Sequence, residues 1–240
     1  MMLIGTELRR IVGRRGSFFG VLAVALVIAA LGFYAIGDAA QSPPLWINLL
    51  GTPLIFGATI VGALEGSYDL SQGTMRYLVL TGVPRWRLVA IRAPALFAAI
   101  TLLCVPAMLV AAFAMLGDGQ AGSDVAHTLA NVWTLSVCWG IVAMAVGTLL
   151  QSNGAGIAVA LVFYFAASII TLVVRSQISE RAGDYLLPNV ISVVARYGDA
   201  PPLDTPDPTA LAFPNALVAL AVWLVVVLGL AALRVKRDEY

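Results

Sequence analysis

The chain has 240 residues, of which 60% are hydrophobic and only 11% are charged, and its mean hydropathy is +0.93. Soluble domains carry about 25% charged residues, so this composition excludes an ordinary soluble domain. The net charge of +1 gives no reason to expect a nucleic-acid partner. The apolar residues gather in runs of about 20, the length of helix that crosses ~30 Å of hydrocarbon. The sequence therefore predicts an all-α integral membrane protein.

Six runs have the length and the low charge of transmembrane helices. In chain order they are residues 17–36, 46–64, 88–116, 125–150, 155–174 and 213–233. Only four residues separate the fourth run from the fifth, which predicts a tight hairpin. The first run follows Arg14 and Arg15 as in a signal peptide. Its length of about 20 residues exceeds the ~7–15 of a signal-peptide core, so we interpret it as a retained span.

The distribution of basic residues predicts the orientation. With the N-terminus inside, the inner segments hold 11 of the 14 Lys and Arg residues, and the outer loops hold eight of the 13 acidic residues. Both termini are therefore expected in the cytoplasm. The thirteen arginines against the single Lys236 suggest a GC-rich bacterial genome, so we expect a multi-pass protein of the bacterial inner membrane in contact with its lipids.

Residues 2–15 form a basic amphipathic segment before the first span. Five apolar residues share one helical face: Leu3, Ile4, Leu8, Ile11 and Val12. Such a segment lies as a helix in the plane of the inner interface. Alternatively it serves only as the positive flank that sets topology, and the two interpretations are compatible.

Residues 65–87 form the longest inner loop. Glu65 is expected to end the second span, Gly73 and Thr74 to begin a short helix over residues 75–80, and Pro84 to stop it. This helix carries an apolar face of Met75, Leu78 and Val79. Because the helix lies outside the bilayer, that face must pack on the ends of its own spans or on a partner protein.

The outer loop, residues 175–212, is predicted to contain a second short helix over residues 189–197, behind Pro188. Its apolar residues at helical spacing are Val190, Ile191, Val193, Val194 and Tyr197. The following residues 198–209 are rich in Pro and Asp and indicate irregular chain. We expect the helix to rest on the outer leaflet, and a gate is the alternative.

The chain lacks the residues of several chemistries. A phosphate-binding loop needs a lysine after a glycine-rich turn, and Lys236 has no such context. We therefore expect no nucleotide cofactor and no enzymatic activity on this chain. His127 is the only histidine, which excludes a two-histidine zinc site, and it is interpreted as a polar interface residue or a proton relay. Cys104 and Cys138 lie in apolar runs and are interpreted as buried hydrophobic residues.

Uncharged polar residues occupy the spans where ion-coupled carriers commonly place ionisable groups. Candidates for a substrate path are Asn48, Thr52, Thr59, Asn131 and Thr134. Alternatively, such residues bond between helices or to carbonyls of their own helix. Arg92, the one charge within a predicted span, is expected to extend to the inner interface. Two small-residue pairs, Gly62 with Gly66 and Ala143 with Gly147, mark helix contacts.

The second inner loop resembles that of the permease subunits of type-2 ABC exporters. The matching features are Glu65 at the end of the second span, Gly73-Thr74, a short leucine-bearing helix and Pro84 before the third span. The sequence departs from the pattern in having Tyr77-Leu78 for a leucine pair, and Arg85 directly after the proline. The basic N-terminal helix, the six-span layout and the Leu187-Pro188 step also match.

The resemblance implies a permease subunit with six transmembrane helices, an N-terminal interfacial helix and a cytoplasmic coupling helix between spans two and three. That helix would dock on a separate ATP-binding ABC subunit, which binds ATP and Mg²⁺, and a second permease subunit would complete the pathway. The implied partner contacts are Glu65, Gly73, Thr74, Met75, Arg76, Leu78 and Arg85.

Two other classes stay open. A stand-alone secondary transporter or channel would need no ATPase, and a membrane anchor or assembly factor would need no transport. The residues do not distinguish export from import, one substrate from another, or a homodimer from a heterodimer.

Overall fold

The structure, a computed structural model, describes residues 43–71, 85–117, 119–196 and 211–237. Nearer the N-terminus it describes single helical positions, namely Arg9, Ile11, Gly13, Phe19, Gly20, Leu22, Ala23, Val24, Leu26 and Val27. The side chains of residues 43–50, 70–71, 85–90, 168 and 180 are outside this description. All regular secondary structure over the described residues is helical.

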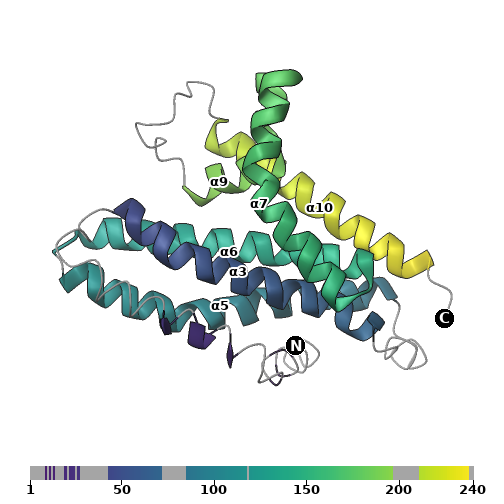
Figure 1. Cartoon of the computed structure of the whole chain (residues 1–240), viewed down its shortest axis with the longest axis horizontal. Coiled ribbons are helices and arrows are strands. Elements are labelled where there is room, and N and C mark those ends of the chain that lie inside the picture. The colour runs from purple at the N-terminus through teal and green to yellow at the C-terminus, as the bar shows by residue number, and fades with distance from the viewer. Residues whose placement is uncertain are drawn as a thin grey trace.

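Seven labelled helices follow one another in the described ranges (Figure 1): α3 Pro43–Ser71, α5 Arg85–Gly117, α6 Gly122–Leu150, α7 Asn153–Gln177, α8 Glu180–Asp184, α9 Leu187–Ala195 and α10 Phe213–Arg237. Five of them cover the second to sixth predicted runs. Helix α3 continues past Glu65, the predicted end of the second span, as far as Ser71. Gly66 costs a free helix about 1 kcal/mol relative to alanine, but here it permits close packing on α6, which keeps the helix intact.

Three of the described helices are long and apolar enough to cross a membrane: Ile91–Gly117 of α5, α6 and α10. Helix α7 adds a fourth if its segments Asn153–Ala167 and Ile169–Gln177, which meet at 51°, make one span. The chain is thus an all-α protein with the helices of a multi-pass membrane protein. The six-span arrangement stays a prediction, because most of the first span and of the interfacial segment lies outside the described residues.

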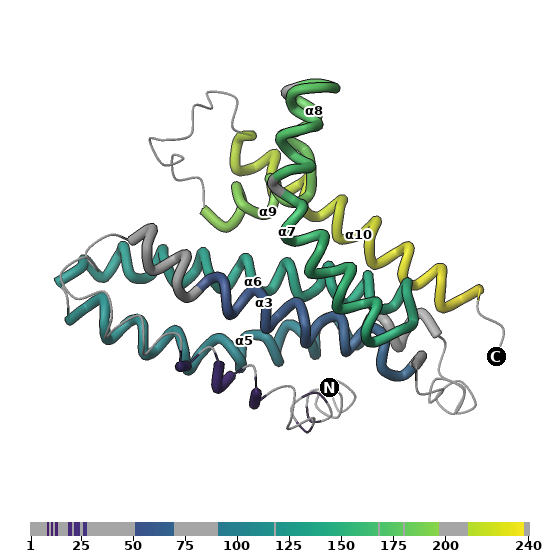
Figure 2. Tube along the Cα trace, viewed as in Figure 1, coloured from purple at the N-terminus to yellow at the C-terminus, as the bar shows by residue number. Residues whose placement is uncertain are grey.

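Helices α3 and α6 run side by side in the same direction, with α5 antiparallel to both (Figure 2). Gly51 of α3 faces Val132 of α6, and Gly66 faces Met144 further along both helices. As a result α3, α6 and α10 finish, and α5 and α7 begin, at one end of the bundle. We call this end the loop end, because residues 72–84 connect α3 to α5 there.

Glycines bring the backbones of α3 and α6 into direct contact. A Cβ at Gly62 would overlap the carbonyl oxygen of Gly140, and one at Gly66 would overlap that of Met144. From the opposite side, a Cβ at Gly147 would overlap the carbonyl oxygen of Ala63. Both predicted small-residue pairs therefore lie at a contact between two helices of the same chain. In lipid the hydrophobic effect does not hold helices together, so close backbone packing takes that role.

Two apolar clusters flank this contact. The first joins α5 to α3 and α6 through buried side chains such as Leu96, Ile100, Leu103 and Leu54. The second joins α6, α7, α9 and α10. Cys104 lies in the first and Cys138 in the second; both are buried free thiols, which confirms their interpretation as buried hydrophobic residues.

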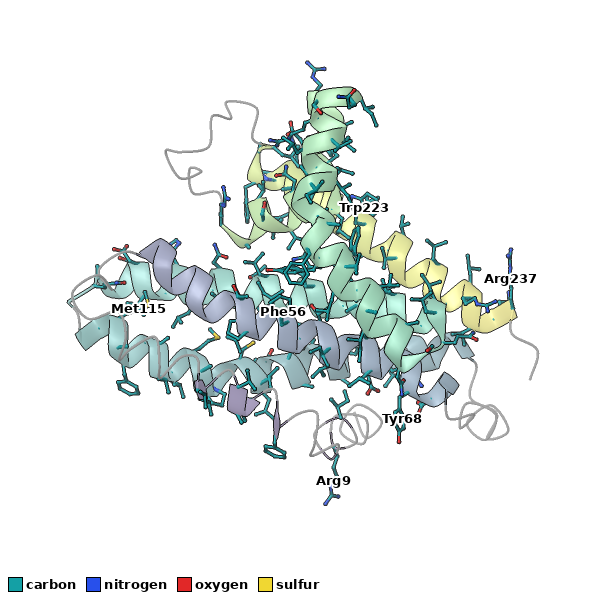
Figure 3. The ribbon with its side chains drawn as sticks, viewed as in Figure 1. Arg9, Phe56, Tyr68, Met115, Trp223 and Arg237 are labelled. Carbon is teal, nitrogen blue, oxygen red and sulfur yellow. The ribbon has the colours of Figure 1, made fainter. Side chains whose placement is uncertain are left out.

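Aromatic rings hold the first half of α7 against its neighbours. Tyr164 stacks edge-on against Trp139 of α6, with ring centroids 5.1 Å apart, and against Phe56 of α3 at 5.3 Å. Phe56 lies at the centre of the molecule in Figure 3. Beyond the bend, Ile169, Leu172 and Val173 are exposed. Before the bend, one side of α7 therefore packs on α3 and α6, and beyond the bend most of the described side chains are exposed.

The predicted outer loop is more helical than expected. Helix α8 was not predicted, and α9 spans Leu187–Ala195 instead of residues 189–197. Pro188 lies in the first turn of α9, where its missing N–H costs no hydrogen bond. The apolar face of α9 is buried in the second cluster, against α6 and α10. The expectation that this face rests on the outer leaflet is therefore wrong.

Adding a single methyl group at the α3–α6 contact should destabilise the fold. We expect Gly62→Ala and Gly66→Ala each to lower the free energy of unfolding by about 1–3 kcal/mol, because the Cβ meets backbone that has no room to move. Gly154→Ala is the matched control, since a Cβ there meets nothing within 4 Å. Thermal unfolding in detergent measures the effect, and equal transition temperatures for all three variants would contradict the contact.

Chemical labelling tests the predicted orientation. In a Cys104→Ala, Cys138→Ala background, Arg181→Cys on α8 and Arg237→Cys at the end of α10 place exposed thiols at the two ends of the molecule. On intact cells, a membrane-impermeant maleimide should label Arg181→Cys alone, and Arg237→Cys only after permeabilisation. The reverse pattern would invert the topology.

Candidate functional site

The last turns of α3 carry three buried polar side chains at the loop end. Glu65, Ser67 and Asp69 are exposed by 1%, 0% and 3%. Because a helix has 3.6 residues per turn, Glu65 and Asp69 share one face, and Ser67 lies on another. Each face meets a different neighbouring helix. The loop end is therefore joined by polar contacts as well as apolar ones.

Asp69 forms a buried ion pair with Arg92 of α5. Nη2 of Arg92 donates to Oδ2 of Asp69, and the two side chains are exposed by only 2% and 5%. Nε and Nη1 of Arg92 are buried without a hydrogen-bond partner among the described residues. The expectation that Arg92 extends to the interface is wrong, because the side chain turns inward to the carboxylate. Removing one partner of a buried pair typically costs about 3–5 kcal/mol.

Ser67 connects α3 to α7. Its Oγ lies 2.8 Å from Oδ1 of Asn153 and 2.8 Å from the carbonyl oxygen of Ala63, so one hydroxyl serves both helices. Asn153 is the first residue of α7. The contact between Ser67 and Asn153 thereby fixes the start of α7 to the end of α3.

Thr148 connects α6 to α3. Its Oγ1 donates to the carbonyl oxygen of Met144 at 2.9 Å and lies 3.3 Å from that of Gly66. Just beyond, Gln151 ends α6 in the left-handed conformation (φ 54°), and its N–H donates to Gly147 at 2.9 Å. This residue reverses the chain, and Ser152 alone separates it from α7, which confirms the predicted hairpin.

The predicted partner contacts are only partly described. Glu65 is inside the bundle, so its carboxylate is not on a surface that another protein can touch. Arg85 is the first residue of α5, and its side chain lies outside the description. Gly73, Thr74, Met75, Arg76 and Leu78 lie outside the described residues. The docking surface on residues 72–84 stays a prediction.

The predicted substrate-path residues lie in different environments. Thr59 is buried and donates to the carbonyl oxygen of Ile55 at 2.7 Å. Thr52 is exposed, and Thr134 is half-buried. Oδ1 of Asn131 is buried without a hydrogen-bond partner among the described residues. The side chain of Asn48 is not described.

Several hydroxyls in the spans bond to their own helix. Besides Thr59, these are Thr101, Ser136 and Thr171, each donating to the carbonyl four residues earlier at 2.8–2.9 Å. The alternative interpretation of polar span residues is confirmed for these four. Each of these four hydroxyls donates its hydrogen bond within its own helix.

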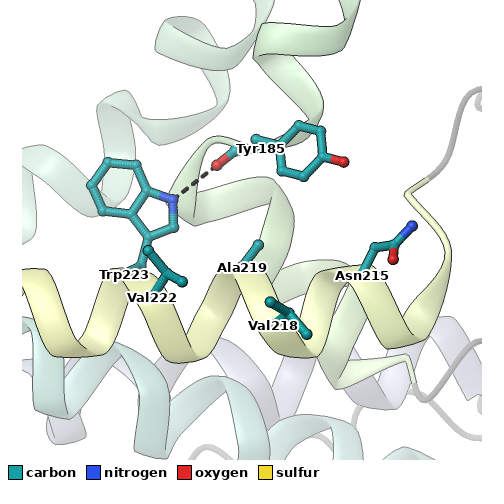
Figure 4. Close-up of a pocket in the computed structure, with 6 residues that line it drawn as sticks. All are labelled: Tyr185, Asn215, Val218, Ala219, Val222 and Trp223. Carbon is teal, nitrogen blue, oxygen red and sulfur yellow. Dashed lines mark hydrogen bonds between the residues drawn. The ribbon is translucent and has the colours of Figure 1, made fainter.

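An open groove of about 530 Å³ lies at the opposite end, along the N-terminal half of α10 (Figure 4). Val218, Ala219, Val222 and Trp223 form its apolar wall, and Tyr185 and Asn215 add polar groups. Nε1 of Trp223 donates to the carbonyl oxygen of Tyr185 at 2.8 Å, which fixes the α8–α9 connection to α10.

Asp69, which forms the buried ion pair, is absent from the site residues predicted from the sequence. The available signal was its spacing of four from Glu65, which places both acids on one face if the helix continues past Gly66. The predicted inner loop begins at Glu65 and therefore includes Asp69, so the sequence alone does not place the two acids on one helix. The groove residues gave no signal, because Tyr185 and Trp223 are 38 positions apart.

Comparisons with known proteins add no assignment. No protein-family model matches the sequence, and a search of curated proteins finds no matching relative.

Single substitutions should reveal the buried ion pair. We expect Arg92→Gln and Asp69→Asn each to lower the free energy of unfolding by about 3–5 kcal/mol, because either one leaves a buried charge without its partner. The exposed Arg181→Gln should change it by less than about 0.5 kcal/mol. Unfolding by denaturant in mixed micelles provides the measurement. If Arg92→Gln were as stable as Arg181→Gln, the buried ion pair would not contribute to stability as predicted.

Proposed function

We propose that this chain is the transmembrane permease subunit of an ATP-driven ABC transporter, acting as an exporter. In this proposal two permease subunits form the substrate pathway, and separate ATP-binding subunits hold ATP and Mg²⁺. The chain itself performs no hydrolysis. Its task is to convert the movement of the partner into movement of its own helices.

The observation that carries the proposal is that α3 ends at Ser71 and α5 begins at Arg85 at the same end of the bundle. Helix α10 finishes at this end with Arg234, Lys236 and Arg237. This basic end is the cytoplasmic end by the positive-inside rule. The segment with the glycine-threonine step and Pro84 thus lies on the side where ATP is available.

A second feature supports a partner rather than a self-contained carrier. The sequence holds no phosphate-binding loop, so any ATP-driven movement must begin on another protein. A segment of 13 residues between two helix ends that are fixed to the same bundle is a suitable contact point, since pushing on it moves both helices. The apolar residues Met75, Leu78 and Val79 would form the contact.

A stand-alone ion-coupled carrier is the second candidate, and one observation favours it. Glu65, Asp69 and Arg92 are buried ionisable residues in a membrane helix bundle, and such residues often serve ion or proton movement. They lie at the loop end, away from the middle of the bundle. A carrier would transport its substrate in vesicles without ATP and stop when the ion gradient is collapsed.

Substitutions in the loop should weaken binding of the ATP-binding subunit. With a candidate P-loop ATPase subunit co-expressed, Leu78→Asp and Arg76→Glu should lower the co-purified ATPase at least about tenfold, a loss of ~1.4 kcal/mol or more. Affinity purification in mild detergent with quantitative blotting measures the ratio of the two subunits.

The matched control is Arg181→Glu, a charge reversal at an exposed arginine of the opposite end. It should leave the ratio unchanged. Recovery of the wild-type chain without any ATPase, or full binding by Leu78→Asp, would refute the docking proposal.

A further inference from the structure

The Asp69–Arg92 pair lies close to both connections of residues 72–84. Asp69 is two residues before the end of α3, and Arg92 is seven residues after the start of α5. At about 1.5 Å per helical residue, these separations are about 3 Å and 10 Å along the helix axes. Any displacement of residues 72–84 therefore reaches the pair within two helical turns on either side.

Helix α3 is already fixed to α6 and α7 near this point. Gly66 places its backbone against Met144 of α6, Thr148 bonds across the same contact, and Ser67 bonds to Asn153 of α7. These contacts make the loop-end segments of α3, α6 and α7 one body. Helix α5 packs on this body through buried side chains such as Ala95 and Leu96.

The ion pair is a buried polar contact that joins α5 to this body at the loop end. Further along, α5 packs on α6 largely through apolar side chains, of which Ile100 against Gly140 is one. A hydrogen bond of 3.1 Å from Nε1 of Trp133 to Oγ1 of Thr101 joins the same two helices near their middle. Apolar contacts permit sliding, because they have no directional partner. A buried guanidinium–carboxylate pair is directional, and separating it would leave two charges away from water. The pair is therefore either formed or broken, because partly separated arrangements of the two charges are unfavourable.

We propose that Asp69 and Arg92 are positioning residues that make α5 move together with the α3–α6–α7 body when residues 72–84 are displaced. This inference rests on the proposed function, because the displacement comes from the ATP-binding partner. Neither residue touches nucleotide or substrate. Their pairing transmits the movement to α5 and so to the opposite end of the bundle.

Three double variants separate this role from simple stability. Asp69→Leu with Arg92→Met replaces the pair by apolar residues of similar volume, a change that buried pairs commonly tolerate in folding. Asp69→Arg with Arg92→Asp exchanges the two charges. Arg175→Met with Asp184→Leu removes the ion pair at the opposite end, whose Nη2 and Oδ1 are 2.7 Å apart, and is the matched control.

The first measurement is the nucleotide response of the full complex in nanodiscs. Spin labels at Phe113→Cys on α5 and Val225→Cys on α10, which are 76% and 72% exposed, report the distance between the two helices. In the wild type and in the control, ATP with vanadate should shift this distance. The apolar variant should bind the ATPase in the wild-type ratio and lose the shift, and the exchanged pair should regain it.

The second measurement needs no partner. In the isolated full chain, amide hydrogen exchange over residues 85–95 should rise at least about tenfold in the apolar variant, with no change in α6. Unchanged exchange, or a full distance shift in the apolar variant, would overturn the role of the pair. A wild-type complex that does not assemble or gives no shift would instead overturn the proposed function, and the coupling role with it.

Discussion

The backbones of α3 and α6 touch because three glycines leave no side chain between them. In lipid, helices gain little by excluding one another's apolar surface from solvent, so close backbone packing and interhelical hydrogen bonds must hold them. Gly62 and Gly66 on one helix and Gly147 on the other allow this approach over more than a turn. The positions of α5, α7 and α10 follow, since each packs against α6.

The same contact creates the environment of the buried polar groups. Because α6 covers one side of α3, the side chains of Ser67 and Asp69 are excluded from solvent and must find partners in α7 and α5. A charge in such a place is stable only when paired, which is why Arg92 turns inward although it is long enough to reach an interface. Glycine packing and ion pairing at the loop end are thus parts of one arrangement.

The opposite end of the bundle is built differently. There α7 bends, its second half faces outward, and α8 and α9 fold back so that Leu187, Val190 and Ile191 fill a cluster with α6 and α10. An ion pair between Arg175 and Asp184 and the Trp223–Tyr185 hydrogen bond fix this cap. The loop end is thus joined by buried polar side chains, whereas the far end combines an apolar cluster with an open groove along α10.

Hydrophobic run length alone predicted the five long helices that the structure describes. The free energy that each residue contributes to membrane insertion depends little on which residues lie near it in space. For that reason the ends of α6 and α10 were predicted within four residues, and Cys104 and Cys138 were correctly interpreted as buried. The loop pattern from Gly73 to Pro84 and the lack of a phosphate loop are likewise local properties of the sequence. They suffice to suggest a partner.

Tertiary packing decided the rest. Whether the helix ends at Gly66 or continues depends on whether α6 lies close enough to pack against the glycine. The local sequence does not contain that information. Whether Arg92 reaches outward or pairs with Asp69 depends on a residue 23 positions away. The apolar face of α9 likewise suits a leaflet or a protein core equally well. Composition determined that this chain enters a membrane, and only the contacts between its helices determined which charges it buries there, because burial is a property of neighbours and not of sequence.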